Sequence, residues 1–326
     1  MKILFTSVGR RVELVRAFKA AAAEISCDVT IYGGDITESA PALYFCDERR
    51  ILKRISDKEY IPSLIELCQK ECIDCVIPTI DTDLYLLSLH KCEFEAVGTR
   101  VLISAPEKIR LCRDKNLTAD YFLSLGLESP KPVNSLSAFE AELKNGSIAF
   151  PVFIKPKDGS SSIGAYKAEN LEELKTFAGM SGDYIIQPFI SGDEYTIDIF
   201  CDYGGLPVYI TPRQRLAVRA GEVLKTRICQ DDVMISQMLR LIEDFKPCGQ
   251  ITVQLIMDSE GVNHYIEINP RFGGGAPLSM KAGANSAREL IRMLSGEKLC
   301  YHEKAARNGS IYSRFDDSIC VYEGDV

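Results

Sequence analysis

Residues with carboxylate, amide and guanidinium side chains occur close together in the sequence near residue 270. Carboxylate and amide oxygens can coordinate magnesium, and a guanidinium can bind phosphate. Apolar and polar residues alternate through 251–256 and again through 266–269, which is the pattern of two half-buried strands. Residues 258–261, Asp-Ser-Glu-Gly, are typical of a turn. The sequence therefore predicts an antiparallel hairpin that carries a carboxylate, two amides and a guanidinium: Glu267, Gln254, Asn269 and Arg271.

A two-residue turn at Ser259 and Glu260 predicts that residue 254 lies opposite 265 and residue 252 opposite 267. In this register the amides and the carboxylate share one face, and the other face carries Ile251, Val253, Leu255, Ile266 and Ile268. A surface hairpin with a solvated polar face would show the same alternation. The glycines at 273–275 favour a ligand site, because a backbone without side chains can approach a ligand closely.

A second candidate segment lies about a hundred residues upstream of the hairpin. Val152–Ile154 is predicted to be a short buried strand, followed by Lys155 and Pro156. The loop after it offers backbone N–H groups and hydroxyls to phosphate oxygens through Gly159, Ser160, Ser161, Ser162 and Gly164. It is not a Walker A motif, and a Gly/Ser loop on its own is often a linker. The lysine before it and the acidic hairpin after it favour phosphate binding.

These segments resemble the ATP-grasp superfamily over nearly the whole chain. The chain looks most like the single-chain proteins related to the large subunit of carbamoyl phosphate synthetase. The resemblance implies an α/β fold with a Rossmann-like pre-ATP-grasp domain at 1–106 and a two-lobed ATP-grasp fold after it. A helical linker and the lid would occupy 107–188, and the C-terminal subdomain with the metal hairpin, α+β in character, would occupy 189–326.

The resemblance also implies roles for individual residues. The cations that contact nucleotide phosphate match Lys115 and Lys155, and the adenine hinge matches Gln187, Pro188, Phe189 and Ile190. The ribose acid matches Glu194, the metal positions match Gln254, Glu267 and Asn269, and Arg271 matches the arginine that steadies the transferred phosphoryl group. The implied ligands are ATP and Mg2+, with Mn2+ as a substitute. The family often has an acid where Gln254 stands, so a second magnesium would be held more weakly.

Arginines are concentrated between the two halves of the predicted grasp. Five cationic side chains fall within residues 213–227 of an otherwise acidic protein. Solvated charge is one explanation, but arginine rather than lysine favours forked recognition of carboxylate or phosphate. We assign this group collectively to the acyl-substrate pocket and the γ-phosphate: Arg213, Arg215, Arg219 and Arg227.

The first hundred residues alternate strand and helix patterns, which predicts a parallel sheet covered by helices. The strands are expected at Lys2–Thr6, Val29–Tyr32, Val76–Pro78 and Val101–Ile103, and the helices at Val12–Ala23, Tyr60–Lys70 and Asp83–His90. The turn at 7–11 has one glycine of a dinucleotide fingerprint, with Asp35 as a candidate ribose ligand, so NAD binding is a weaker alternative. Residues 79–83, after a strand, could bind a ligand or cap a helix.

Two smaller patterns also bear on the fold. Ser104 and Glu107 form a predicted capping box that starts a helix at the domain boundary. The cysteines at 68, 72 and 75 have the spacing of an iron–sulfur motif. However, Cys75 falls in a predicted buried strand, so reduced structural thiols are the favoured interpretation.

Composition excludes several classes of protein. The chain has 326 residues, 46% hydrophobic and 26% charged, which are globular values. A net charge of −8 argues against nucleic acid as the main partner, and no apolar run could span a membrane. The first residues do not form a signal peptide, so a cytoplasmic location is expected.

The residues and the resemblance together predict an ATP-dependent carboxylate–amine ligase that acts through an acyl phosphate. Its partners would be a small carboxylic acid and an amine, and a homodimer is the expected oligomer. A carbamate- or bicarbonate-phosphorylating enzyme and a non-catalytic ATP-binding regulatory module are the alternatives.

Overall fold

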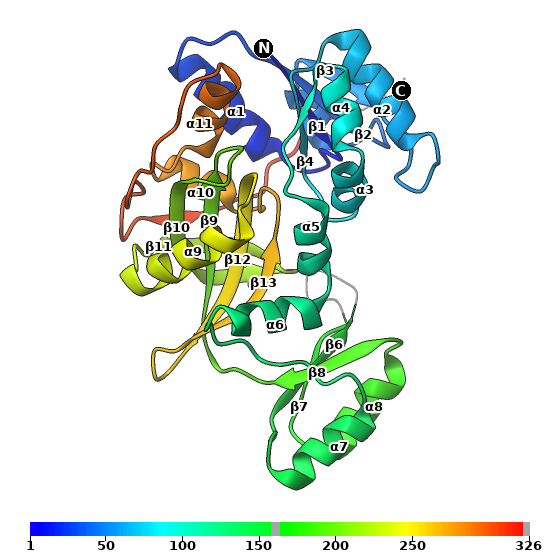
Figure 1. Cartoon of the computed structure of the whole chain (residues 1–326), viewed down its shortest axis with the longest axis vertical. Helices are drawn as coiled ribbons and strands as arrows, with labels where there is room; N and C mark the ends of the chain where they lie inside the picture. Colours follow the sequence, from blue (N-terminus) through cyan, green and yellow to red (C-terminus); the bar gives the residue numbers. More distant parts are fainter. Residues whose placement is uncertain (158–163, 322–326) are drawn as a thin grey trace.

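A computed structural model of the chain describes residues 1–157 and 164–321. Figure 1 shows three sheets, with the N-terminal sheet at one end, the lid sheet at the other and the largest sheet beside the line between them. The helices that join the first sheet to the lid, α5 (Pro106–Arg113) and α6 (Lys115–Ser124), lie between these two sheets, and α6 lies across the long axis of the molecule (Figure 1).

The N-terminal sheet is parallel, as predicted. Its five strands lie in the order β3-β2-β1-β4-β5. They are β1 (Lys2–Thr6), β2 (Thr30–Asp35), β3 (Glu48–Ile51), β4 (Cys75–Pro78) and β5 (Arg100–Val101). The helices between them are α1 (Val12–Glu24), a 3-10 turn at Pro41–Phe45, α2 (Tyr60–Glu71), α3 (Leu84–Leu89) and α4 (Lys91–Ala96). Cys75 is buried in β4, as the sequence predicts, and Cys72 is exposed at the end of α2.

The lid sheet has three antiparallel strands in the order β7-β6-β8. They are β6 (Val152–Pro156), β7 (Tyr166–Ala168) and β8 (Tyr184–Pro188). Two helices, α7 (Leu136–Asn145) and α8 (Leu171–Met180), pack on it (Figure 1).

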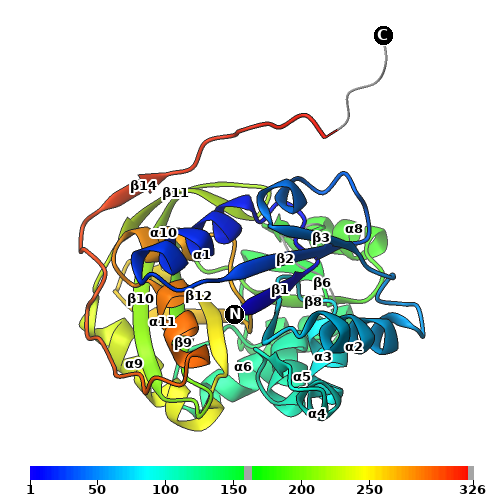
Figure 2. The ribbon, with the colours of Figure 1, turned by 90° about the horizontal axis from the view of Figure 1, so that it is seen from above.

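The largest sheet is antiparallel throughout, in the order β13-β12-β9-β10-β11-β14. Its strands are β9 (Gly192–Cys201), β10 (Pro207–Arg219), β11 (Glu222–Ile228), β12 (Gly249–Asp258), β13 (Asn263–Asn269) and β14 (Ile311–Ser313). The apolar side chains of α9 (Asp232–Phe245) cover one face. Two further helices, α10 (Ala276–Lys281) and α11 (Ser286–Leu294), pack against α1, which lies between them and the N-terminal sheet (Figure 2).

The hairpin of β12 and β13 forms where predicted, but its predicted register is wrong. Gln254 pairs with Glu267, and Leu255 with Tyr265, so Ile266 is an extra residue on β13. This bulge turns Tyr265 into the core, where it is fully buried, and leaves Ile266 partly exposed rather than in the core. The turn is also longer than two residues, because the Asp258 carboxylate accepts hydrogen bonds from backbone N–H groups as far as residue 262. The prediction that the amides and the carboxylate share one face is confirmed.

The predicted capping box at Ser104 is also wrong. The helix begins at Pro106 with Ala105 at its N-cap and no side-chain cap. The Ser104 hydroxyl instead accepts a hydrogen bond from the Cys248 N–H at 3.1 Å, directly before β12. A tertiary contact between the N-terminal sheet and the largest sheet thus replaces the local one.

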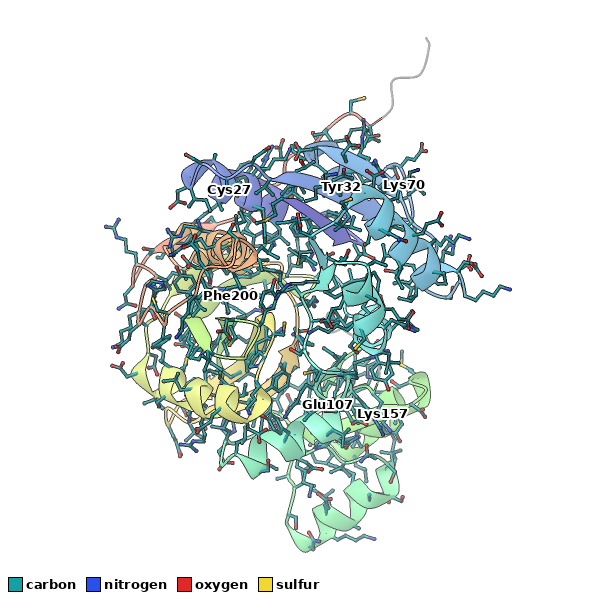
Figure 3. The ribbon with its side chains drawn as sticks, turned by 45° about the horizontal axis from the view of Figure 1, so that its top comes forward. Cys27, Tyr32, Lys70, Glu107, Lys157 and Phe200 are labelled. Carbon is teal, nitrogen blue, oxygen red and sulfur yellow. The ribbon has the colours of Figure 1, made fainter. Side chains whose placement is uncertain are left out.

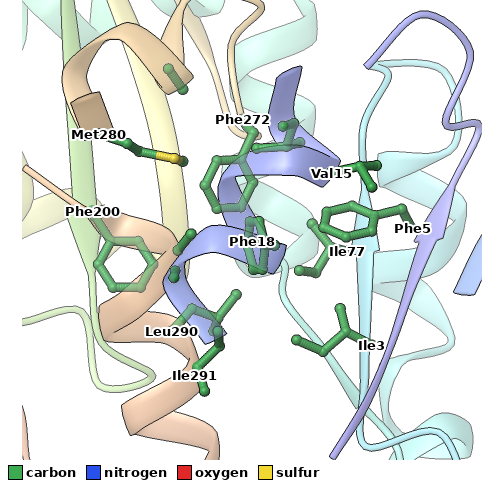
Figure 4. Packing of buried hydrophobic residues seen from close by; sticks show 14 of the residues in the cluster. Ile3, Phe5, Val15, Phe18, Ile77, Phe200, Phe272, Met280, Leu290 and Ile291 are labelled. Atoms are coloured by element: carbon green, nitrogen blue, oxygen red, sulfur yellow. The ribbon is translucent and has the colours of Figure 1, made fainter. Parts of the chain in front are cut away.

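One apolar cluster joins the two ends of the chain. Phe18 of α1 makes edge-to-face contacts with Phe5 of β1 and with Phe272, at centroid distances of 5.0 and 5.7 Å. Leu290 of α11 and Phe200 of β9, labelled in Figure 4, also belong to this cluster, and Figure 3 shows Phe200 in the setting of the whole molecule. Phe272 directly follows Arg271, so this packing fixes the chain beside a predicted site residue.

In the described part of the chain, no helix combines the length and the apolar character needed to cross a bilayer.

Candidate functional site

A cavity of about 630 Å³ lies between the lid sheet, the largest sheet and the loop after β1. It brings together most of the predicted site residues: Lys115, Lys155, Gln187, Pro188, Phe189, Ile190, Glu194, Arg213, Arg215, Gln254, Glu267, Asn269 and Arg271. These residues come from positions more than 150 apart in sequence, so their convergence is a property of the fold.

Two lysines form the cationic wall of the cavity. Lys155 lies on β6, and Lys115 lies at the start of α6, where its ammonium donates to the Lys157 carbonyl at 2.7 Å. Burial lowers the pKa of Lys155 to about 8; the negative charge of Glu267 opposes this shift and the positive charge of Lys115 adds to it. Above a pH of about 8, such an amine is expected to gain a proton when a phosphate binds.

Apolar side chains from the lid sheet, from the segment after it and from the hairpin form another wall of the cavity. Phe153 and Phe189 lie with their ring centroids 6.5 Å apart, and Ile256 and the bulged Ile266 line the same cavity. The Gln187 side chain donates to the Pro130 carbonyl, so it holds the strand end rather than pointing freely into the cavity. This wall suits the flat faces of a nucleotide base.

The amides and the carboxylate of the hairpin form a compact hydrogen-bonded group. The Glu267 carboxylate accepts from Gln254 Nε2 at 2.5 Å and from Asn269 Nδ2 at 2.9 Å. Gln254 Oε1 accepts from Arg215 Nη1 at 2.7 Å, so this amide oxygen is already engaged. Asn269 Oδ1 lies 3.3 Å from Arg271 Nη2.

The donor set fits a magnesium ion that shares its coordination with phosphate and water. Within residues 1–157 and 164–321, no three His, Cys, Asp or Glu side chains gather into a metal site. Glu267 supplies the carboxylate of the hairpin group, and Asn269 adds an amide oxygen. Mg2+ commonly uses one or two protein carboxylates and completes its shell with substrate phosphates and water.

Arg271 connects the hairpin to the N-terminal sheet. Its Nη2 donates to Asp81 Oδ2 at 2.6 Å, and Asp81 lies in the loop after β4 that the sequence marks as a ligand loop or a helix cap. Arg271 is 13% exposed, and its buried Nε has no hydrogen-bond partner among the described residues. Asp83, two residues further on, is fully buried, and its side chain makes no cap bond; Thr6 and Tyr60 donate hydroxyl hydrogen bonds to it instead.

Arg213 belongs to a buried polar group that the sequence did not reveal. Its Nε donates to Asp198 Oδ2 at 2.7 Å, and both side chains are at most 3% exposed. Ser279 and Thr252 also donate to the Asp198 carboxylate, at 2.6 and 3.2 Å. Over the described ranges, Arg213 Nη1 has no partner although it is buried in the cavity wall. An unpaired guanidinium nitrogen of this kind is expected to meet an anionic ligand atom.

Two of the predicted arginines are not brought to the cavity. Arg227 on β11 lies opposite Gln214 on β10, so these two side chains are on the same face of the sheet. Arg213 and Arg215, on either side of Gln214, are on the other face. Arg219 follows two register shifts near the end of β10 and forms an exposed ion pair with Asp316. Neither lines the cavity.

The loop residues Gly159, Ser160, Ser161 and Ser162 lie outside the described residues. Gly164, just after them, has φ +72° and lies against Pro156. Asp35 has no ligand-like geometry, because its carboxylate accepts hydrogen bonds from the backbone N–H groups of Gly9, Ile36 and Thr37.

Sequence reasoning missed Arg11 and Glu222, which also line the cavity. Arg11 follows the first parallel strand, and ligands often bind at the carboxyl ends of such strands. That position was the available signal, although the Arg10-Arg11 pair does not by itself show which arginine points inward.

Two family models match the chain. Residues 3–102 match the PylC-like N-terminal domain, and residues 181–313 match the model described as ATP-grasp in the biosynthetic pathway with Ter operon. A D-alanine–D-alanine ligase of Marinomonas sp. is 25% identical over an alignment of 219 residues, and the match covers 59% of this chain and 69% of that protein. A carbamoyl-phosphate synthase of Methanobrevibacter smithii is 25% identical over an alignment of 252 residues, and the match covers 72% of this chain and 67% of that protein.

Solved structures show the same architecture. The biotin carboxylase domain of Hydrogenobacter thermophilus 2-oxoglutarate carboxylase, solved as a dimer with MgADP, ADP and bicarbonate, has a TM-score of 0.75 at 17% identity over 95% of this chain and 73% of that one. N5-carboxyaminoimidazole synthetase from Staphylococcus aureus has a TM-score of 0.72 at 16% identity over 92% and 78%. The parallel sheet, the antiparallel sheets and the two matching models together show that this chain belongs to the ATP-grasp superfamily.

Proposed function

We propose that the protein is an ATP-dependent ligase that joins a carboxylic acid to an amine through an acyl phosphate. The observation that carries the proposal is a cavity that two lysines line together with Glu267, Asn269 and Arg271. Lysines neutralise nucleotide phosphates, and an acidic hairpin beside an arginine suits the metal and the transferred phosphoryl group.

Magnesium would be held by Glu267 and Asn269, and when bound it would neutralise charge on the phosphate oxygens. Gln254 is the weaker candidate ligand, because Arg215 already occupies its amide oxygen. Glu194, exposed at the cavity edge and 3.4 Å from Arg215 Nε, is proposed to hold the ribose.

The protein's own groups would act mainly by position and charge. Lys115 and Lys155 bind the phosphates, while Arg213, Arg215 and Arg271 orient the substrate carboxylate toward the γ-phosphorus. A carboxylate oxygen attacks that phosphorus, the bond from the γ-phosphorus to the bridging oxygen breaks, and ADP leaves. The amine nitrogen then attacks the acyl carbon and loses a proton, the bond from that carbon to the phosphate oxygen breaks, and phosphate leaves.

The preorganised guanidiniums are suited to stabilise the negative charge that develops in both steps. Arg213 is held rigidly by Asp198, and its unpaired Nη1 is available to an oxyanion in the cavity. Arg219 and Arg227 have no role in this proposal, because neither lines the cavity.

The test is a screen of carboxylic acids and amines for release of ADP and phosphate. The expected result is ADP release that requires ATP, magnesium, one acid and one amine together, and that is lost in Lys155→Met. Thermal shift should show stabilisation by MgATP greater than by GTP or NAD, because a ligand that binds only the native state stabilises it. Stronger stabilisation by NAD would contradict the assignment.

A bicarbonate-phosphorylating enzyme is the second candidate. A carbamoyl-phosphate synthase is among the relatives, and its matched segment covers 72% of this chain at 25% identity, close to the 74% covered by a D-alanine–D-alanine ligase of Francisella tularensis. ATP turnover that depends on bicarbonate alone, with no gain from any acid in the screen, would favour this candidate. Binding of MgATP without turnover under any condition would favour a regulatory module. A homodimer and a cytoplasmic location also belong to the proposal.

A further inference from the structure

Arg11 is a cavity residue that the proposed reaction does not use. It lies in the loop after β1, and its side chain is 20% exposed. Its Nη2 reaches the Thr79 carbonyl at 3.4 Å, and its Nη1 lies 3.9 Å from Glu222 Oε1. Both contacts are long for interactions of a guanidinium.

The acidic neighbour of Arg11 is already engaged elsewhere. Glu222 accepts a hydrogen bond from Arg314 Nη1 at 2.8 Å and is 54% exposed. Asp81, the other nearby carboxylate, is held by Arg271 at 2.6 Å. No tight carboxylate contact to Arg11 occurs among the described residues, although the side chain is largely buried.

Arg11 is also placed close to another positive charge. Its pKa is lowered by burial and, next, by the charge of Arg271. Two guanidiniums held near each other in a partly buried cavity repel, and an anion between them would remove this repulsion.

The backbone makes room for this arrangement. A Cβ on Gly274 would lie 2.8 Å from Arg11 Nη1 and 3.3 Å from Glu222 Oε2. Gly274 therefore allows the chain after Arg271 to pass directly beside the Arg11 guanidinium. Its neighbour Gly275 does the same for Arg213, since a Cβ there would lie 2.5 Å from Arg213 Nη2.

We propose that Arg11, beside Arg271, binds a second anionic group of the acid substrate. The substrate would then be an acid with two oxyanionic groups, either two carboxylates or one carboxylate and one phosphate. One group reacts beside Arg213 and Arg215, and the other is recognised at the carboxyl end of the N-terminal parallel sheet, where such sheets bind ligands. This inference rests on the proposed ligase function, because it names the class of its acid.

Binding is measured first, on the full chain in the presence of MgADP, so that the result does not depend on turnover. The probes are succinate and glutarate as dicarboxylates, 3-phosphoglycerate as a phosphate-bearing acid, and butyrate as the monoacid reference. Wild type is expected to bind at least one two-anion probe more tightly than butyrate. Tighter binding of the dicarboxylates identifies the second group as a carboxylate, and tighter binding of 3-phosphoglycerate identifies it as a phosphate.

The variants separate recognition from folding. Arg11→Met should weaken the binding of the two-anion probe by about 10- to 100-fold, which is the loss expected for a hydrogen bond between charged groups. The binding of butyrate should stay unchanged. Arg11→Lys should lose less, because it keeps the charge but not the forked geometry. Arg10→Met is the matched control, since Arg10 is exposed, does not line the cavity and should change nothing. Gly274→Ala should reproduce the selective loss by displacing the Arg11 guanidinium.

Two results would overturn the inference: no preference of wild type for any two-anion probe, or equal losses for butyrate and the two-anion probe in Arg11→Met and Gly274→Ala. The same variants are then compared in ADP release, where the ratio of kcat/KM for the two-anion acid to that for butyrate should fall in Arg11→Met. Absence of ADP release with every acid and amine, beside Arg11-dependent binding, would refute the ligase and leave the recognition site standing.

Discussion

Lys155 should make nucleotide binding depend on pH in the alkaline range. Burial lowers its pKa to about 8 in the free protein, so the amine is mostly neutral at a pH of about 9. A bound phosphate favours the ammonium form and should return the pKa to at least its ordinary value of about 10.4. The protein must therefore take up a proton at Lys155 when the nucleotide binds above a pH of about 8.

These two pKa values give the size of the effect. The ATP dissociation constant should rise about twentyfold between about pH 7.5 and about pH 9.5, which corresponds to about 1.8 kcal/mol. Near a pH of about 9, each bound nucleotide should take up about 0.9 proton. The dissociation constant rises with pH because the lowered pKa lets the amine lose its proton in this range. The neutral amine no longer attracts the negatively charged phosphate.

Isothermal titration calorimetry of ATP in EDTA, in buffers with different ionisation enthalpies, measures both quantities without a metal ion near the amine. Lys155→Arg is the matched variant, since arginine stays protonated throughout this range. It should bind ATP with little pH dependence and with no proton uptake near pH 9. A wild-type dissociation constant that is flat across the range, or a variant that takes up as many protons as wild type, would refute the placement of Lys155 at the phosphates.

Four further predictions concern the site and its support. Glu267→Gln should keep the fold but raise the magnesium concentration needed for ATP turnover, because a neutral amide replaces the carboxylate; unchanged magnesium dependence would remove Glu267 from the metal site. Arg271→Lys should bind ATP nearly normally, but its turnover at saturating ATP should fall about 100-fold or more, which corresponds to about 3 kcal/mol of activation free energy. Equal turnover in variant and wild type would mean that Arg271 has only a structural role. Phe272→Ala should lower the free energy of unfolding by about 3–5 kcal/mol in urea denaturation, because it empties the contact with Phe18. Burial raises the pKa of Asp83 to about 6, so the protonated form that stabilises the native state is lost as the pH rises through about 6. Asp83→Asn should therefore raise the free energy of unfolding by up to about 3 kcal/mol at neutral pH and by almost nothing below a pH of about 3, and a gain independent of pH would contradict this origin.

The features that the sequence predicted well depend on local patterns. The parallel sheet follows from alternating strand and helix periods, and the shared face of Gln254, Glu267 and Asn269 follows from the two-residue repeat of strands. Both patterns are complete within short windows of sequence.

The features that it missed depend on contacts between distant segments. The bulge at Ile266 and the register shifts near Arg219 change which face a side chain occupies, and the residues carry no local signal of either. Ser104 has the right chemistry for a helix cap but is used by Cys248, 144 positions away. The sequence around Arg11 did not show that this residue lines the cavity, because its setting is made in part by Gly274, which is far away in the sequence. The domain borders at 106 and 188 remain predictions.

The cluster around Phe18 has a consequence for the order in which this protein can be built. The apolar face of α1 packs against Phe272 and against Leu290 and Ile291 of α11, which leave the ribosome some 250 residues later. At a synthesis rate of about 5–20 residues per second, that face stays uncovered for about ten seconds or more. The N-terminal sheet is therefore not expected to fold stably without the later residues, and a fragment of residues 1–106 should be poorly soluble. A chaperone is expected to bind α1 during translation.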